Sequence, residues 1–330
     1  MTANVMDACS SLLRGTIIAP PGKKLVVSDL SNIEGRGLAW LAGEEWKLQA
    51  FRDFDNGIGA DLYKLAYAKA FRLDPGEVDK FGRQIGKVME LGLGYAGGVN
   101  AFVTFALVYS IDLEEMAGIA WDTLPPESVV EANDFLDWQE SKGATFPMSR
   151  RAATVCEVFK RLWRAAHPAT TQLWRDLEDG FREATTTPGK TFIKGRFKIR
   201  RDGAWLRVVL PSGRALCYPF PQVDDRGQCS FQGVDQFTRK WKRVKTYSGK
   251  LVENATQSFA RDILYDAMPR VEAAGYKIVL HVHDELVTEA PDTDEFNEAH
   301  LSALLAEPPE YAPDMPLAAA GFEALRYRKD

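Results

Sequence analysis

The sequence is poor in cysteine, in long apolar runs and in net positive charge. Its 330 residues include only four cysteines, and none of them forms a Cys-x-x-Cys pair. We therefore expect reduced thiols, and neither a disulfide framework nor a zinc site. The four are Cys9, Cys156, Cys217 and Cys229. No apolar stretch approaches the ~18 residues that span a bilayer, and no secretory leader is evident, so we expect a cytoplasmic protein with no membrane partner.

The formal net charge is −5, and the isoelectric point is about 5.6. Such a chain does not attract nucleic acid over its whole surface, so any contact of this kind needs a local basic patch. One candidate is the run 239–250, which mixes basic side chains with Trp241 and Tyr247. A solvated charged face is the alternative for this run. The length allows one large domain or two interlocked ones.

The segment 278–287 holds acidic residues between two apolar runs. Its β-branched residues favour strands, and the polar centre His283-Asp284-Glu285 predicts a hairpin with carboxylates in its turn. Carboxylates fixed between buried strands need a positive partner to offset their desolvation, which suggests a hard divalent cation. A polar hairpin tip exposed to water is the alternative.

A second acid occupies a matching place near the N-terminus. The apolar strand that begins at Lys23 ends at Asp29, and the chain then enters a helix over 33–41. Two strand-end aspartates far apart in sequence can face each other on adjacent strands of one sheet. If Asp29 and Asp284 share a pair of Mg²⁺ ions, they can clamp the attacking and leaving oxygens of a phosphoryl transfer.

The segment 80–95 predicts a helix with one functional face. Its residues Arg83, Lys87, Leu91 and Tyr95 are each four apart, so they form one slowly drifting stripe. Arginine and lysine on adjacent turns can grip a triphosphate, and an aromatic further along can stack on a base. The alternative is a solvated basic pair above a core tyrosine.

The remaining pattern is helical for the most part, with strands late in the chain. We expect a helix boundary at His167-Pro168, where the histidine is structural. Strands are expected over 191–193 and 205–210. Helices are expected over 46–71 with a break, over most of 100–185, around 162–181, over 251–273 and over 296–305.

Taken together, these stretches resemble the polymerase domain of family A DNA polymerases, the bacterial DNA polymerase I-like group, and particularly its phage-encoded members. Residues 29–36 resemble the first motif of the family, 83–95 the second and 283–285 the third. Their order and spacing agree, and a helix that bears Gln257 precedes the third. The resemblance covers essentially the whole chain.

The resemblance implies an α+β fold of right-hand architecture. A palm, made of a small antiparallel sheet and helices, would carry Asp29 and Asp284. A mainly helical fingers subdomain would be inserted between them. On this basis we expect palm over residues 1–54, fingers over 55–245 and palm again over 246–330.

The resemblance also assigns roles to the acidic and basic residues. Asp29 and Asp284 would hold two Mg²⁺ ions, with the carbonyl of Leu30 in one coordination shell and Glu285 in a supporting role. Arg83 and Lys87 would bind the incoming triphosphate. Lys87 would also protonate the pyrophosphate leaving group, as a general acid.

Further residues would shape the nucleotide site and the DNA contacts. Tyr95 would stack against the templating base pair, and Glu34 would fill the space that a ribose 2′-hydroxyl needs. Three positions depart from the family pattern: Leu91 replaces an aromatic residue, Glu90 a small polar one and Tyr63 a histidine. The expected contacts to primer-template DNA are Gln257, His283, Asn254 and Arg14.

The implied activity is that of a DNA-templated DNA polymerase, in replication or repair, in the cytoplasm of a bacterial host. Its partners would be primer-template DNA and dNTPs. Because few residues precede Asp29, we expect neither a proofreading exonuclease nor most of a thumb, and a weak grip on duplex DNA. One alternative is a single-subunit RNA polymerase, against which Glu34 argues. Another is a truncated or split subunit that binds primer-template DNA and needs a separate thumb or exonuclease chain, or a processivity factor.

Overall fold

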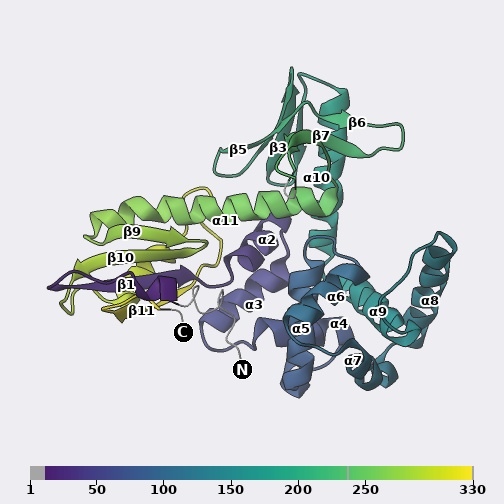
Figure 1. The fold of residues 1–330 in the computed structure, drawn as a ribbon, viewed down its shortest axis with the longest axis horizontal. Helices are drawn as coiled ribbons and strands as arrows, with labels where there is room; N and C mark the ends of the chain where they lie inside the picture. Colours follow the sequence, from purple (N-terminus) through teal and green to yellow (C-terminus); the bar gives the residue numbers. More distant parts are fainter. Residues whose placement is uncertain (1–11, 236–237, 329–330) are drawn as a thin grey trace. The chain divides into compact units, whose positions relative to one another are not determined.

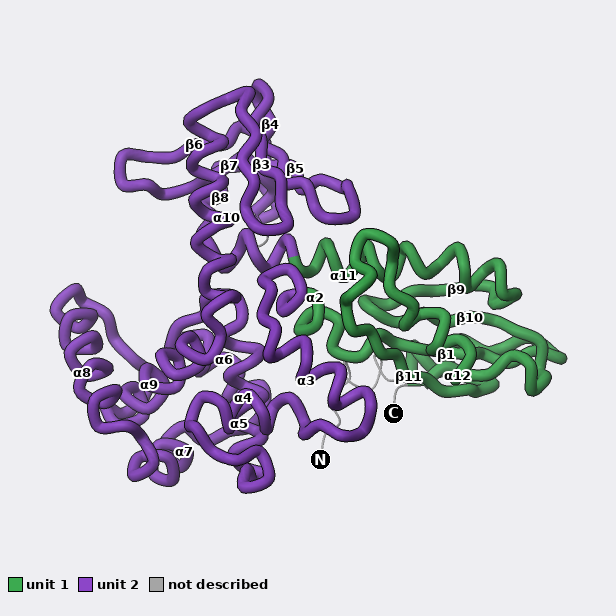
Figure 2. The backbone as a smooth tube through the Cα atoms, turned by 180° about the vertical axis from the view of Figure 1, so that it is seen from behind, with its two compact units in different colours: residues 1–37, 256–330 green, residues 38–255 purple. Residues whose placement is uncertain are grey.

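The computed structural model describes residues 12–235 and 238–328. Figure 1 shows the helices and strands in chain order. The chain forms two compact units, coloured separately in Figure 2. Unit 1 contains residues 1–37 and 256–330, and unit 2 contains residues 38–255. The chain therefore leaves unit 1 early and returns to it for its last quarter.

Unit 1 is built on a four-stranded antiparallel sheet in the order β11-β1-β10-β9. The strands are β1 (Lys23–Leu30), β9 (Lys277–Val282), β10 (Glu285–Pro291) and β11 (Ala319–Ala324). Helix α12 (Glu298–Leu305) packs on β1 and β11. The long helix α11 (Ser248–Ala273) starts in unit 2 and continues in unit 1.

The sequence of β1 explains its central place in this sheet. Leu25 and Val27, two residues apart, point to the same face of the strand, where they join Val287 and Tyr327 in a buried cluster. On the other face, the hydroxyl of Ser28 lies 2.8 Å from that of Ser302 in α12. A strand that is covered on both faces is buried at nearly every position, as β1 is from Lys24 to Ser28.

Two features of this sheet differ from the expectation. Strand β9 was expected to be buried, but it is the edge strand, and Val279 and Leu280 are 39% and 37% exposed. Strand β11 was not expected, because its sequence Ala-Ala-Gly-Phe-Glu-Ala lacks β-branched residues. Gly321 permits the pairing, since a Cβ there would lie 2.0 Å from the carbonyl oxygen of Val27.

Unit 2 begins with helices, and polar residues mark where several of them start. Asp61 accepts backbone hydrogen bonds at the start of α4, Asp79 at α5 and Ser149 at α9. The helices are α2 (Ile33–Ala42, shared with unit 1), α3 (Glu45–Asp55), α4 (Leu62–Phe71), α5 (Lys80–Leu93), α6 (Val99–Val108), α7 (Leu113–Ala120), α8 (Pro126–Ser141), α9 (Arg150–Ala166) and α10 (Pro168–Thr186). Short 3₁₀ turns cover Pro75–Glu77 and Trp121–Thr123.

The expected boundary at His167-Pro168 is present, and it divides the helix expected around 162–181 into α9 and α10. The helix expected over 80–95 is α5, which ends two residues early at Leu93. The predicted α+β class is confirmed.

The stretch between α10 and α11, residues 187–247, is β structure and is called the β segment below. It contains two antiparallel sheets, β2-β3-β4-β5 and β6-β7-β8. The strands are β2 (Thr191–Lys194), β3 (Phe197–Asp202), β4 (Trp205–Val209), β5 (Ala215–Pro219), β6 (Gln222–Val223), β7 (Cys229–Val234) and β8 (Trp241–Lys245). The inserted part of the chain is therefore less uniformly helical than we expected.

Candidate active site

The acidic residues at the ends of β1 and β10 come together in unit 1. Asp29 is the direct cross-strand partner of Glu285, and the backbone N–H of Leu30 donates to the carbonyl of Asp284 at 3.1 Å. Directly paired residues of an antiparallel sheet project to the same face. Asp284 occupies the two-residue turn between β9 and β10, next to His283, whose φ of 56° is left-handed. This turn brings a third carboxylate to the end of β1.

These carboxylates border one cavity of about 400 Å³. The cavity is also lined by Arg14, by the turn and by strand β11. Tyr327 donates its hydroxyl hydrogen bond to Glu285. Burial, together with the charge of Glu285, raises the pKa of Tyr327 to about 12, so this tyrosine is a stable donor. No sequence pattern pointed to Tyr327, because only the pairing of the chain ends brings it here.

The donor set suits a magnesium site that is completed by substrate. Carboxylate and carbonyl oxygens are hard ligands, and Mg²⁺ is usually held by one or two carboxylates together with phosphates and water. Within residues 12–235 and 238–328, no group of three His, Cys, Asp or Glu side chains could hold an ion unaided. A pair of aspartates, with substrate oxygens as the remaining ligands, agrees with that finding.

Helix α5 carries the predicted basic pair in unit 2. A guanidinium nitrogen of Arg83 lies 3.0 Å from a carboxylate oxygen of Asp61, and its carbon lies 5.3 Å from the centre of the Tyr63 ring. The ammonium of Lys87 lies 4.2 Å from the centre of the Tyr109 ring. Tyr109 was missed by sequence reasoning, because it follows α6 and has no motif around it. Burial is the main cause that raises the pKa of Tyr63.

The other predicted nucleotide contacts lie on both units. Leu91 is half-buried on α5, and Tyr95 follows the helix and is also half-buried. The backbone carbonyl of Tyr95 is so close to Gly249 that a Cβ there would lie 2.0 Å from it. Glu34 is exposed in the first turn of α2, in unit 1.

A buried ionic cluster fixes the inner face of α5. Glu90 pairs with the ammonium of Lys47 and accepts a 2.8 Å hydrogen bond from the indole N–H of Trp163. Nε2 of His167 lies 3.2 Å from Glu90 Oε1, and its ring stacks on Trp163 at 4.0 Å. Burial alone would raise the pKa of Glu90, but Lys47 and His167 outweigh it and hold the pKa below its usual range. Glu90, where the family has a small polar residue, thus links α5 to Lys47 of α3 and Trp163 of α9.

The four expected DNA contacts have different surroundings. Gln257 on α11 and His283 in the acidic turn are exposed. Arg14 lines the acidic cavity. Asn254 is half-buried, and its amide donates to the hydroxyl of Tyr218 at 3.3 Å. The Asn254 amide thus has a partner within the protein, and this contact does not involve DNA.

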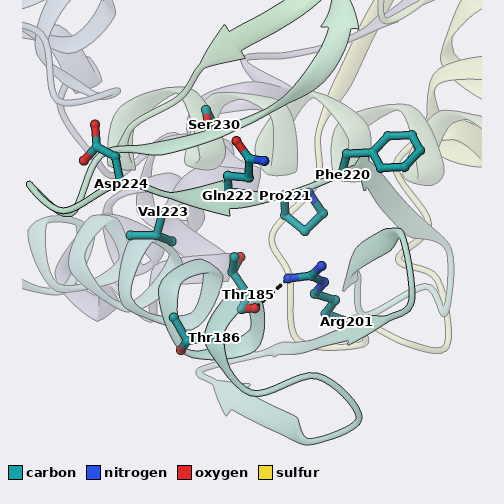
Figure 3. A pocket seen from close by; sticks show the side chains of 9 residues that line it. All are labelled: Thr185, Thr186, Arg201, Phe220, Pro221, Gln222, Val223, Asp224 and Ser230. Carbon is teal, nitrogen blue, oxygen red and sulfur yellow. Dashed lines mark hydrogen bonds between the residues drawn. The ribbon is translucent and has the colours of Figure 1, made fainter.

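A second cavity, of about 420 Å³, lies in unit 2 between the end of α10 and strand β6. Figure 3 shows its lining side chains. Among them, Arg201 Nη1 donates to the carbonyl of Thr185 at 2.8 Å. None of the predicted site residues lines this cavity, so the acidic cavity of unit 1 is the candidate active site.

The described cysteines Cys156, Cys217 and Cys229 are free thiols, as expected, whereas Cys9 lies outside the described residues. Burial raises the pKa of Cys156 to about 12 and that of Cys229 to about 11. Among helices built from the described residues, none has the length and apolar character needed to cross a bilayer.

The fold is that of a nucleic-acid polymerase domain. It matches the POL domain of Pol1 from M. smegmatis, a structure in complex with DNA primer-template and dNTP, with a TM-score of 0.55 and 18% sequence identity. The match covers 95% of this chain and 41% of that one.

The sequence comparisons point to particular relatives. The chain is 32% identical over 329 residues to a DNA polymerase of Bacillus phage SP02, a match that covers 97% of this chain and 44% of that protein. It is 33% identical over 90 residues to DNA polymerase I of Chloroflexus aurantiacus, which covers 27% and 9% respectively. No protein-family model matches the sequence. The predicted resemblance to DNA polymerase I-like polymerases is confirmed, and the chain spans less than half the length of these relatives.

Proposed function

We propose that this chain carries out DNA-templated DNA synthesis. A primer 3′-hydroxyl attacks the α-phosphorus of a dNTP, and pyrophosphate leaves. The observation that carries the proposal is the meeting of Asp29 and Glu285 across β1 and β10, with Asp284 in the adjoining turn. Similarity to a phage DNA polymerase over 97% of the chain supports it.

Unit 1 supplies the acidic half of the proposed chemistry. Asp29, Asp284 and the carbonyl of Leu30 would hold two Mg²⁺ ions. Such ions, when bound, neutralise charge on the attacking and leaving oxygens. Glu285 would support the pair, held in place by its hydrogen bond from Tyr327.

Unit 2 supplies the cationic half. Arg83 and Lys87 lie one turn apart on α5, so both can bind the phosphates of one nucleotide. Lys87 would give its proton to the departing pyrophosphate. Its contact with Tyr109 holds the ammonium beside an aromatic face before substrate arrives. Tyr95, Leu91 and Tyr63 would contact the base and sugar.

Sugar selection is proposed for Glu34. A side chain that fills the space beside C2′ rejects a ribonucleotide on steric grounds. Parallel primer extension with dNTPs and rNTPs tests this step, and a Glu34→Ala variant should accept rNTPs more readily than the wild type. Gln257, His283, Asn254 and Arg14 would contact the primer-template.

The central test is Mg²⁺-dependent primer extension by the wild type and by Asp284→Asn. The variant loses a metal ligand, which forfeits several kcal/mol of transition-state stabilisation, so its rate should fall about a thousandfold. Asp292→Asn is the matched control, because Asp292 is exposed just beyond the opposite end of β10. It should extend primers like the wild type.

Primer extension, combined with a primer-template binding assay, also tests whether the chain is a split subunit that needs a second polypeptide. Tight primer-template binding with no extension by the wild type would favour a chain that needs a second polypeptide. Equal extension by the wild type and Asp284→Asn would refute the assigned catalytic role of the acid pair.

A further inference from the structure

The β segment concentrates positive charge in an acidic protein. Residues 187–247 contain fourteen lysines and arginines but only four aspartates and no glutamate. The whole chain, in contrast, has 41 basic and 46 acidic residues. A local excess of this size attracts a polyanion even though the molecule as a whole is negative.

The register of the β2-β3-β4-β5 sheet sorts its residues onto two faces. The inner face is apolar: Phe197, Ile199 and Leu206 are fully buried, and the sheet packs on α10, which lies beside it in Figure 1. At Gly180 of α10 a Cβ would lie 2.4 Å from the Ile199 side chain, so helix and sheet are in close contact. The residues between these positions must therefore face outward.

The outer face carries cations beside exposed apolar side chains. Arg200 pairs directly with Arg207, and Lys198 with Ile193, which is 72% exposed. Trp205 on the same face is 43% exposed, opposite Asp202. Basic groups beside exposed aromatic rings are the combination that binds single-stranded nucleic acid, because phosphates meet the cations and bases stack on the rings.

The like-charged pair Arg200 and Arg207 is an unfavourable arrangement for the protein alone. One carboxylate, that of Asp202, lies 2.8 Å from Arg200 Nε and 3.8 Å from Arg207 Nη1. A single negative charge shared by two guanidinium groups, with Lys198 on the same face, leaves an excess of positive charge. Phosphates would neutralise that excess.

The second sheet of the β segment repeats the pattern. On β8, every second residue points to the same face, and these residues are Trp241, Arg243 and Lys245. Trp241 is 61% exposed. The opposite face of the hairpin packs inward, since Phe231 of β7 meets the ring of Tyr218 edge-on at 5.0 Å. Two independent sheets thus present tryptophan and cations together.

We propose that the outer face of the β2-β3-β4-β5 sheet binds single-stranded DNA. Duplex DNA offers its phosphates but keeps its bases stacked inside, so it would give the exposed Trp205 and Ile193 no partner. If the proposed function holds, the single strand bound here is the unpaired part of the template; this step alone rests on the proposed function. The binding surface itself rests on the charge and the sheet register.

The test is fluorescence anisotropy of labelled oligo(dT) with the full chain over a range of KCl concentrations. Arg200→Gln/Arg207→Gln should weaken binding, and the slope of log K against log [KCl] should fall by about 1.4, the value for two lost phosphate contacts on a single strand. Trp205→Ala should weaken binding about tenfold through lost stacking. The control Lys142→Gln/Arg175→Gln removes the same charge from exposed positions outside the β segment and should keep the wild-type slope.

The contrary results are distinct. If oligo(dT) does not bind the wild type, or binds the sheet variant and the control alike, the proposal is wrong. If the sheet variant loses blunt duplex and oligo(dT) equally while Trp205→Ala binds both normally, the surface takes phosphates of any DNA and the single-strand assignment is wrong. If the double variant does not fold, Arg207→Gln alone decides, because it keeps the Arg200–Asp202 ion pair.

Primer extension separates this proposal from the proposed function. On a template that ends one nucleotide beyond the primer, both double variants should extend as the wild type does, because almost no single strand is present. Failure of the wild type to extend would count against the polymerase proposal, and the oligo(dT) titration would still decide the role of the sheet.

Discussion

At the scale of single residues, Glu90 departs from the family pattern and holds a buried ionic cluster together. The side chains of Glu90 and Lys47 are only 12% and 6% exposed. Removing one partner of a buried pair leaves the other charge without compensation, which typically costs about 3–5 kcal/mol. The ring of His167 and the indole of Trp163 complete the surroundings of the carboxylate.

We predict that Glu90→Gln lowers the free energy of unfolding by about 3 kcal/mol at neutral pH. The folded-state pKa of Glu90 lies below its usual value of 4.5, so its contribution is present above that pH and is lost as the pH falls below it. Urea titrations between about pH 3 and pH 7 should therefore show a shallower acid dependence for the variant. Exposed Glu115, as Glu115→Gln, is the control and should change little. An unchanged acid limb in Glu90→Gln would contradict the assignment.

The positions of the candidate site residues in strands, turns and helices could be predicted from sequence where they belonged to a short local pattern. Asp29 ends an apolar strand, Asp284 lies in a hairpin turn, and Arg83 and Lys87 share one helix face. Tyr327, Tyr109 and Lys47 could not be found in this way, because each contacts a partner more than twenty residues away in the sequence. Periodicity reports the local element and does not report which distant element it meets.

At the scale of elements, two glycines on α5 set how closely it approaches α4. A Cβ at Gly86 would lie 2.0 Å from the carbonyl oxygen of Tyr63, and one at Gly82 would lie 3.2 Å from the ring of Tyr67, both on α4. At Gly86 the neighbour is backbone, so a side chain there would force α5 away from α4. The glycine face therefore fixes the position of the neighbouring stripe that bears Arg83 and Lys87.

We predict that Gly86→Ala destabilises the protein by about 1–3 kcal/mol and raises the KM for dNTP, because α5 must shift away from α4. Gly118→Ala is the matched control: Gly118 lies inside α7, and no other side chain or backbone atom lies within 4 Å of the place its Cβ would take. That change should stabilise by up to about 1 kcal/mol through helix propensity. Thermal melts and steady-state extension kinetics measure both effects. Equal behaviour of the two variants would mean that the close approach is not a constraint.

Helices and strands differed in how well their sequences predicted them. Strong amphipathic period and capping residues marked α5, and proline marked the start of α8 and α10. Strand β11 and most of the β segment were missed, because small residues or alternating cations hide the period of two. The predicted boundaries at 54 and 245 remain a proposal for palm and fingers, while the compact units divide after residues 37 and 255.

At the scale of the whole molecule, thiol reactivity should follow burial. Cys156 and Cys229 are fully buried with raised pKa values, whereas Cys217 is exposed on β5. We predict that, in a Cys9→Ser background, Ellman's reagent at about pH 8 modifies Cys217 rapidly and the other two only on unfolding. A Cys217→Ala variant should abolish the fast phase. Rapid reaction of all three in the native protein would contradict the buried positions.

The topology of unit 1 has a consequence for biosynthesis. Strand β1 precedes both of its neighbours in the sheet, β10 and β11, by more than 250 residues. On the ribosome, both edges of β1 stay unpaired until β10 and β11 have emerged. The acidic cluster of Asp29, Asp284 and Glu285 therefore cannot form in a nascent chain that lacks β10.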